Sequence, residues 1–220
     1  MPGETDDTPF RTGPGKVRHW FVHGPDTHYN MEAFLVSTGI VALAEIGDKT
    51  QLLSILLAAR FRKPVPIILG IFISTLVNHA CAGVVGGWIT QVLGADILRW
   101  ILGAGFIAMA VWMLIPDKLD DEEAPSGTQR GLGILGTTIV AFFFAEMGDK
   151  TQIATVALAA RFHDVIAVVA GTTIGMLLAN VPAVLLGDKF ATRMPIKLVH
   201  RIAALIFLAL GVMALLGVGK

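Results

Sequence analysis

The heptapeptide Glu45-Ile46-Gly47-Asp48-Lys49-Thr50-Gln51 occurs again, 101 residues later, as Glu146-Met147-Gly148-Asp149-Lys150-Thr151-Gln152. The likeness continues past the heptapeptide, because 12 of the 18 residues of 44–61 are identical to those of 145–162. Both copies lie inside stretches that are otherwise apolar. The chain is therefore built by duplication, and the duplicated part is the polar part.

The composition is that of an integral membrane protein. Of the 220 residues, 54% are apolar and only 15% are charged, and the mean hydropathy is +0.70. Soluble domains average about a quarter charged residues. The formal net charge is zero, which argues against nucleic acid as a partner.

Six stretches are apolar and long enough to cross a bilayer. A helix that spans the ~30 Å hydrocarbon core needs about 20 mainly apolar residues. Prolines at 64, 66 and 116 stand at the ends of such stretches, where helix boundaries are expected. The stretches are 33–59, 65–89, 95–115, 132–160, 165–187 and 198–218. We therefore expect an all-α membrane protein with six transmembrane helices.

The remaining residues divide the chain into four parts. Residues 1–30 are polar, lack the apolar core of a signal peptide and are predicted to be a disordered extension. The acidic segment 117–131 is predicted to be a linker between two three-helix repeats, 31–116 and 132–220. Because three is odd, the second repeat should enter the membrane from the opposite side. Such inverted repeats are typical of transporters that bind substrate near the midplane.

Further features concern packing and orientation. Two glycine pairs, at 83 and 87 and at 171 and 175, are spaced for close helix packing. Lysines and arginines near the span ends number nine on the side of the acidic linker and six on the other. This bias predicts a cytoplasmic linker and two external termini. The oligomeric state is left open, and a homo-oligomer is compatible with the sequence.

The heptapeptides hold ionisable residues far from the ends of the spans. Each such residue costs ~2.5–3.5 kcal/mol at the centre of a span, so these positions are functional by default. The alternative is a structural role, in which Glu45 pairs with Lys49 and Glu146 with Lys150, each four residues apart on one helix. That alternative leaves Asp48 and Asp149 without partners.

Together the two motifs suggest a cation site. Four carboxylates and two lysines leave two negative charges, which suits one divalent cation or two protons. Hard oxygen ligands favour Mg²⁺, Ca²⁺ or Mn²⁺ over softer metals. The candidate metal ligands are Glu45, Asp48, Glu146 and Asp149. The candidate supporting residues are Gln51 and Gln152, Asn78 and Asn180 (as amide oxygen donors), Lys49 and Lys150, and Thr50 and Thr151.

Two details of the motif depend on its backbone. On an ideal helix the two threonines face away from the carboxylates. Gly47 and Gly148, however, permit a break, and an unwound segment also offers carbonyl oxygens. The neighbouring His79 is predicted to be a hydrogen-bonded core residue without a role in the site.

The chemistry of the cluster predicts exchange of metal for protons. Clustered carboxylates repel one another when ionised, and a metal that binds them displaces protons. Alternating exposure of one such site would give antiport. A passive divalent-cation channel would use the same carboxylates and is the alternative. An enzyme, such as an intramembrane aspartyl protease, is not expected, because the glycine that precedes its Gly-Asp pair is replaced here by Glu45 or Glu146.

The doubled Glu-φ-Gly-Asp-Lys-Thr-Gln pattern, where φ is apolar, resembles the GDT-type cation/proton antiporters, above all their bacterial MneA-like manganese exporters. The resemblance covers residues 31–220. It implies that Glu45, Asp48, Glu146 and Asp149 bind the metal and that Mn²⁺, or else Ca²⁺, is exported against protons. The short loops and the lack of organelle-targeting features predict a multi-pass protein of the bacterial inner membrane. The metal and the protons are expected as cargo, and no cofactor is expected.

Overall fold

The computed structural model describes residues 27–115, 133–186 and 195–217, and every regular element in these ranges is a helix. The helices are α1 (Thr27–Glu45), α2 (Lys49–Phe61), α3 (Pro64–Val92), α4 (Ala95–Trp112), α5 (Gly133–Glu146), α6 (Lys150–Phe162), α7 (Val165–Leu186) and α9 (Ile196–Leu216). The expected all-α class is thus confirmed for the described residues. The predicted linker 117–131 and residues 1–26 of the predicted extension lie outside them, and α1 already begins at Thr27.

Each repeated heptapeptide divides a predicted span into two helices. The break between α1 and α2 turns at Gly47, and that between α5 and α6 turns at Gly148, with φ angles of 82° and 77°. Glycine adopts this left-handed region without the steric penalty of a Cβ atom. Asp48 and Asp149 then occupy the N-cap positions of α2 and α6. The prediction of continuous helices over 33–59 and 132–160 is therefore wrong, whereas the break that the glycines permit is confirmed.

The other four predicted spans correspond to single helices. Within the described residues, α3, α4, α7 and α9 are long and apolar enough to cross a membrane. Their ends lie within three residues of the predicted bounds. Pro64 and Pro66 stand in the first turn of α3, where a missing backbone N–H costs no helical hydrogen bond.

The helices of the two halves pack reciprocally. The broken pair α1 and α2 lies against α7, the broken pair α5 and α6 lies against α3, and α3 in turn contacts α7. Close approach of α1 and α7 requires glycine: a Cβ atom at Gly171 would lie 2.5 Å from the Phe34 carbonyl oxygen, and one at Gly175 would lie 2.6 Å from that of Thr38. The close packing predicted for this glycine pair is confirmed.

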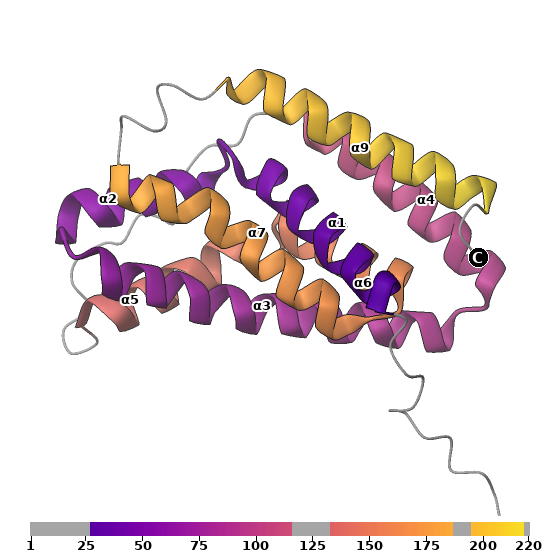
Figure 1. Ribbon diagram of the computed structural model, residues 1–220, viewed down its shortest axis with the longest axis horizontal. Helices are drawn as coiled ribbons and strands as arrows, with labels where there is room; N and C mark the ends of the chain where they lie inside the picture. The colour runs from indigo at the N-terminus through magenta and orange to yellow at the C-terminus, as the bar shows by residue number, and fades with distance from the viewer. Residues whose placement is uncertain (1–26, 116–132, 187–194, 218–220) are drawn as a thin grey trace, which may run out of the picture.

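Helices α4 and α9 form a layer of their own. They run side by side along one edge of the molecule (Figure 1), and the rings of Phe106 and Phe207 meet between them at 6.2 Å. This layer contacts the other helices mainly where α9 lies on α1 and α4 lies on α6.

Candidate metal centre

Both breaks carry their carboxylates into the protein interior. The side chains of Glu45 and Glu146 are 0% exposed, Asp48 is 1% exposed and Asp149 is 5% exposed. Burial of a carboxylate is costly unless the group is paired, hydrogen-bonded or bound to a metal. Four such groups within two short segments require a common explanation.

Three of the four carboxylates converge. Glu45, Asp48 and Asp149 each present an oxygen, and these oxygens all lie within 4.8 Å of one another. Oxygen ligands at 2.0–2.6 Å from one ion are separated by at most about 4–5 Å, so a single divalent cation fits this cluster. The cluster draws on both motifs, and all its members are buried. Glu146 is not part of it.

The lysines pair across the two motifs. Lys150 Nζ lies 3.5 Å from Asp48 Oδ1, and Lys49 Nζ lies 3.7 Å from Asp149 Oδ1. The inference that Asp48 and Asp149 would be left without partners is therefore wrong. The breaks explain the difference, because residues on either side of a turn at glycine no longer share a helix face.

The two glutamines cap the breaks. Gln51 Oε1 accepts a hydrogen bond from the Gly47 N–H at 3.0 Å, and Gln152 Oε1 accepts one from the Gly148 N–H at 2.7 Å. Their amide oxygens, predicted as metal donors, are thus used to satisfy backbone groups that a broken helix leaves without partners. Gln51 also reaches across to α7, where its Nε2 donates to the Ala179 carbonyl oxygen at 3.2 Å.

Each asparagine contacts a motif helix of the other half of the chain. Asn78 of α3 contacts α5, and Asn180 of α7 contacts α1. Asn180 Nδ2 lies 3.5 Å from Glu45 Oε1, while its Oδ1 accepts a 2.7 Å hydrogen bond from the Ser54 hydroxyl. Asn78 Nδ2 donates to the Phe143 carbonyl oxygen at 3.2 Å. Asn180 therefore orients a carboxylate of the cluster, whereas Asn78 holds the backbone of α5.

Glu146, which is not one of the three clustered carboxylates, has different neighbours. Its Oε2 accepts a hydrogen bond from the Thr151 hydroxyl at 3.1 Å and lies 3.9 Å from His79 Nε2. Thr151 thus faces a carboxylate, contrary to the expectation for an ideal helix, because the break reorients α6. The equivalent Thr50 is also buried, but its hydroxyl makes no hydrogen bond to a described residue.

Two histidines lie close to the motifs. The sequence predicts no role in the site for His79 and does not single out His200. His79 is 0% exposed, and neither ring nitrogen makes a hydrogen bond within the described ranges, so the prediction of a hydrogen-bonded core residue is wrong. His200 Nε2, from α9, lies 2.7 Å from the Ile46 carbonyl oxygen. That carbonyl, expected to be available to a cation, is therefore engaged by α9. The only sequence signal for His79 was its position beside Asn78. No sequence signal pointed to His200.

Comparison with known proteins covers nearly the whole described chain. The model of the family described as "Divalent cation/proton antiporter GDT1" matches residues 33–121 and 134–219. Both heptapeptides fall within the matched segments.

Individual relatives come from bacteria and plants. A Vibrio cholerae protein named "Putative manganese exporter" is 52% identical over 183 residues, which cover 83% of this chain and 90% of the relative. A GDT1-like protein of Synechocystis is 29% identical, with 80% of this chain and 93% of the relative covered. The GDT1-like protein 3 of Arabidopsis thaliana is 26% identical, with 82% and 69% covered. No solved structure matches the chain.

Proposed function

The chain belongs to the divalent cation/proton antiporter family GDT1, and from this membership we propose that it exports a divalent cation, Mn²⁺ in the first place, in exchange for protons. The observation that carries the proposal is the buried cluster of Glu45, Asp48 and Asp149, whose oxygens lie within 4.8 Å of one another. The family is one of transporters, which agrees with the expectation that the chain is not an enzyme.

The donor set supports a hard divalent cation as the cargo. Every group in the cluster offers a carboxylate oxygen, the type of ligand that Mg²⁺, Ca²⁺ and Mn²⁺ share. Mn²⁺ takes precedence among these because the Vibrio cholerae relative is named as a manganese exporter and aligns over most of both chains. Ca²⁺ is the second candidate cargo.

The charges of the site support exchange rather than simple passage. Asp48 and Asp149, two oxygen donors of the cluster, each lie within 4 Å of a lysine from the other motif. A cation that enters must compete with these ammonium groups and with protons for the same oxygens. Release of the metal is therefore favoured when protons and lysines neutralise the carboxylates again, which couples metal export to proton entry.

The arrangement of the helices supports six crossings built as an inverted repeat. If α1 with α2 and α5 with α6 each count as one broken crossing, successive crossings run in alternating directions along the bundle (Figure 1). The reciprocal packing of each broken pair on the long helix of the other half fits a pseudo-twofold axis. Broken helices that meet near the midplane are the usual site builders of such transporters. In the proposed inner-membrane topology the 117–131 linker is cytoplasmic.

Flux in proteoliposomes with an imposed pH gradient tests the proposal. We expect uptake of Mn²⁺ to drive counter-movement of protons, and Asp48→Asn to abolish both. Asp96→Asn is the matched control, because Asp96 is exposed and lies in the first turn of α4. Metal flux that ignores the pH gradient would favour the passive channel. Absence of flux for Mn²⁺, Ca²⁺ and Mg²⁺ alike would overturn the transporter.

A further inference from the structure

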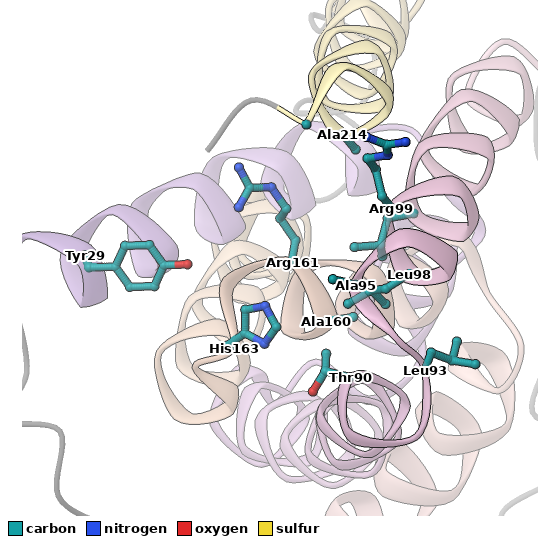
Figure 2. Close-up of a pocket in the computed structure, with 12 residues that line it drawn as sticks. Tyr29, Thr90, Leu93, Ala95, Leu98, Arg99, Ala160, Arg161, His163 and Ala214 are labelled. Atoms are coloured by element: carbon teal, nitrogen blue, oxygen red, sulfur yellow. The ribbon is translucent and has the colours of Figure 1, made fainter. Parts of the chain in front are cut away.

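A cavity of about 610 Å³ lies at the end of the molecule opposite the α2–α3 connection, away from the carboxylate cluster. Residues of α1, α3, α4, α6 and α9 line it, so it occupies the seam between the α4–α9 layer and the other helices. Figure 2 shows Arg161 and His163 on one side of it and Arg99 with Ala214 on the other. The metal centre uses none of these residues.

The cavity is basic. Arg99 and Arg161 line it from different helices, and none of the described residues that line it is acidic. Arg99 Nε is buried and donates no hydrogen bond to a described residue, although the guanidinium lies 5.5 Å from the Trp100 ring centroid. A buried donor without an acceptor is costly, and guanidinium groups match the oxygens of a phosphate. The cavity is thus complementary to an anion.

His163 does not add to the positive charge near neutral pH. Burial, with a contribution from the neighbouring Arg161 guanidinium, lowers the pKa of this imidazole, which lies in the α6–α7 connection. A neutral ring still offers one N–H donor. The positive charge of the lining therefore comes from the two arginines. An anion between them would offset the repulsion between their guanidinium groups.

Apart from Tyr29 and Thr90, the rest of the lining is apolar, and it lies where a membrane interface is expected. Leu93, Leu98 and Leu102 form much of its wall. Trp88 and Trp100, both 59% exposed, flank the α3–α4 connection at the same end. Exposed tryptophans of this kind are typical of the headgroup level of a bilayer. A ligand with an anionic head and an apolar body fits both parts of the cavity.

We propose that this cavity binds an anionic phospholipid, with its phosphate held by Arg99 and Arg161 and an acyl chain along the leucines. The lipid would join α4 and α9 to α1 and α6 across a seam where these helices share few other contacts. A cavity of this size accommodates the headgroup and the adjoining part of one chain.

Lipid binding to the purified full chain tests the proposal. We expect native mass spectrometry from a neutral detergent to show phosphatidylglycerol bound about tenfold more tightly than phosphatidylcholine with the same acyl chains. Arg99→Gln and Arg161→Gln should each weaken phosphatidylglycerol about tenfold, the loss typical of one charge-assisted hydrogen bond. Equal affinity for the two lipids would overturn the proposal.

Because the chain is duplicated, each of the two arginines has a counterpart in the other repeat that serves as a matched control. Arg60 and Arg201 are the counterparts of Arg161 and Arg99, are exposed, and do not line the cavity. Arg60→Gln and Arg201→Gln should leave phosphatidylglycerol binding unchanged, and an equal loss in these variants would indicate only general surface attraction.

Displacement of the lipid by millimolar inorganic phosphate would assign the site to a soluble anion and overturn the proposal of a bound lipid. If Arg99→Gln does not fold, Arg99→Lys, which loses the forked donors, should bind several-fold more weakly; unchanged binding would contradict the proposal.

Discussion

The two copies of the heptapeptide have nearly the same sequence but different surroundings. Glu45 of the first copy belongs to the carboxylate cluster and is approached by Asn180 at 3.5 Å. Glu146 of the second copy is bound instead by Thr151 and approached by His79. Duplication therefore supplies two equivalent sets of groups, and the neighbouring helices make the two sets unequal.

The backbone breaks differ in the same way. A Cβ atom at Gly47 would lie 2.4 Å from Cγ2 of Ile196 at the start of α9, whereas one at Gly148 would meet nothing within 4 Å. His200 of α9 lies within hydrogen-bonding distance of the first break, and Met147 at the second break is 53% exposed. Within the described residues, one break is covered by α9 and the other is open. An inverted-repeat transporter in a single state is expected to show such inequality, because alternating access exchanges the roles of its halves.

The largest expected effect is that of the aspartates. Asp48→Asn and Asp149→Asn should both abolish Mn²⁺ flux, but they should differ in stability. Lys150, the partner of Asp48, is 1% exposed, whereas Lys49, the partner of Asp149, is 17% exposed. Loss of one member of a buried ion pair costs about 3–5 kcal/mol, and less where solvent reaches the other member. Thermal unfolding in detergent should therefore show Asp48→Asn as the less stable variant. Equal stabilities would contradict the unequal burial.

The glutamates should differ in metal binding. Glu45→Gln removes an oxygen of the cluster, so we expect the affinity for Mn²⁺ to fall by about 10–100-fold, as for loss of a group that orients or binds a metal. Glu146→Gln leaves the three oxygens of the cluster in place, so we expect it to lower the affinity less than Glu45→Gln does. Isothermal titration of both variants checks this. A greater loss of affinity in Glu146→Gln would show that Glu146 also binds the metal.

The glycines offer a test of the covered and open breaks. Gly47→Ala and Gly148→Ala both place a Cβ atom at positive φ, which costs about 1–2 kcal/mol. Only Gly47→Ala also collides with Ile196, which should add about 1–3 kcal/mol. Chemical unfolding should rank the two accordingly, and Ile196→Ala should restore part of the loss. Gly105→Ala in α4, with nothing within 4 Å, is the control. Equal losses at the two glycines would refute the covered break.

The smallest expected effect is that of His200. His200→Leu removes the contact with the Ile46 carbonyl oxygen and places there the residue type found at the equivalent position 98. We expect a loss of stability of about 0.5–1.5 kcal/mol, the net value of one hydrogen bond. Flux should remain measurable. Complete loss of Mn²⁺ transport in a folded variant would instead assign His200 to the transport site.

Much of the architecture is predictable because it depends on local properties. Apolar stretches of sufficient length predict α3, α4, α7 and α9, and prolines predict the start of α3. The breaks at Gly47 and Gly148 could be foreseen as allowed conformations. That they occur is a tertiary result, because each break is stabilised by glutamine caps and, at Gly47, by α9.

The sequence by itself determined that the chain is a duplicated helical membrane protein with two carboxylates near the middle of the first predicted span of each repeat. These features follow from composition, length and residue identity. Only the tertiary structure decided which charges meet. Lysines pair with aspartates of the other motif, three carboxylates cluster without Glu146, and α9 covers one break alone. Such choices depend on the packing of helices that are more than 100 residues apart in sequence. Two nearly identical motifs can therefore have different partners.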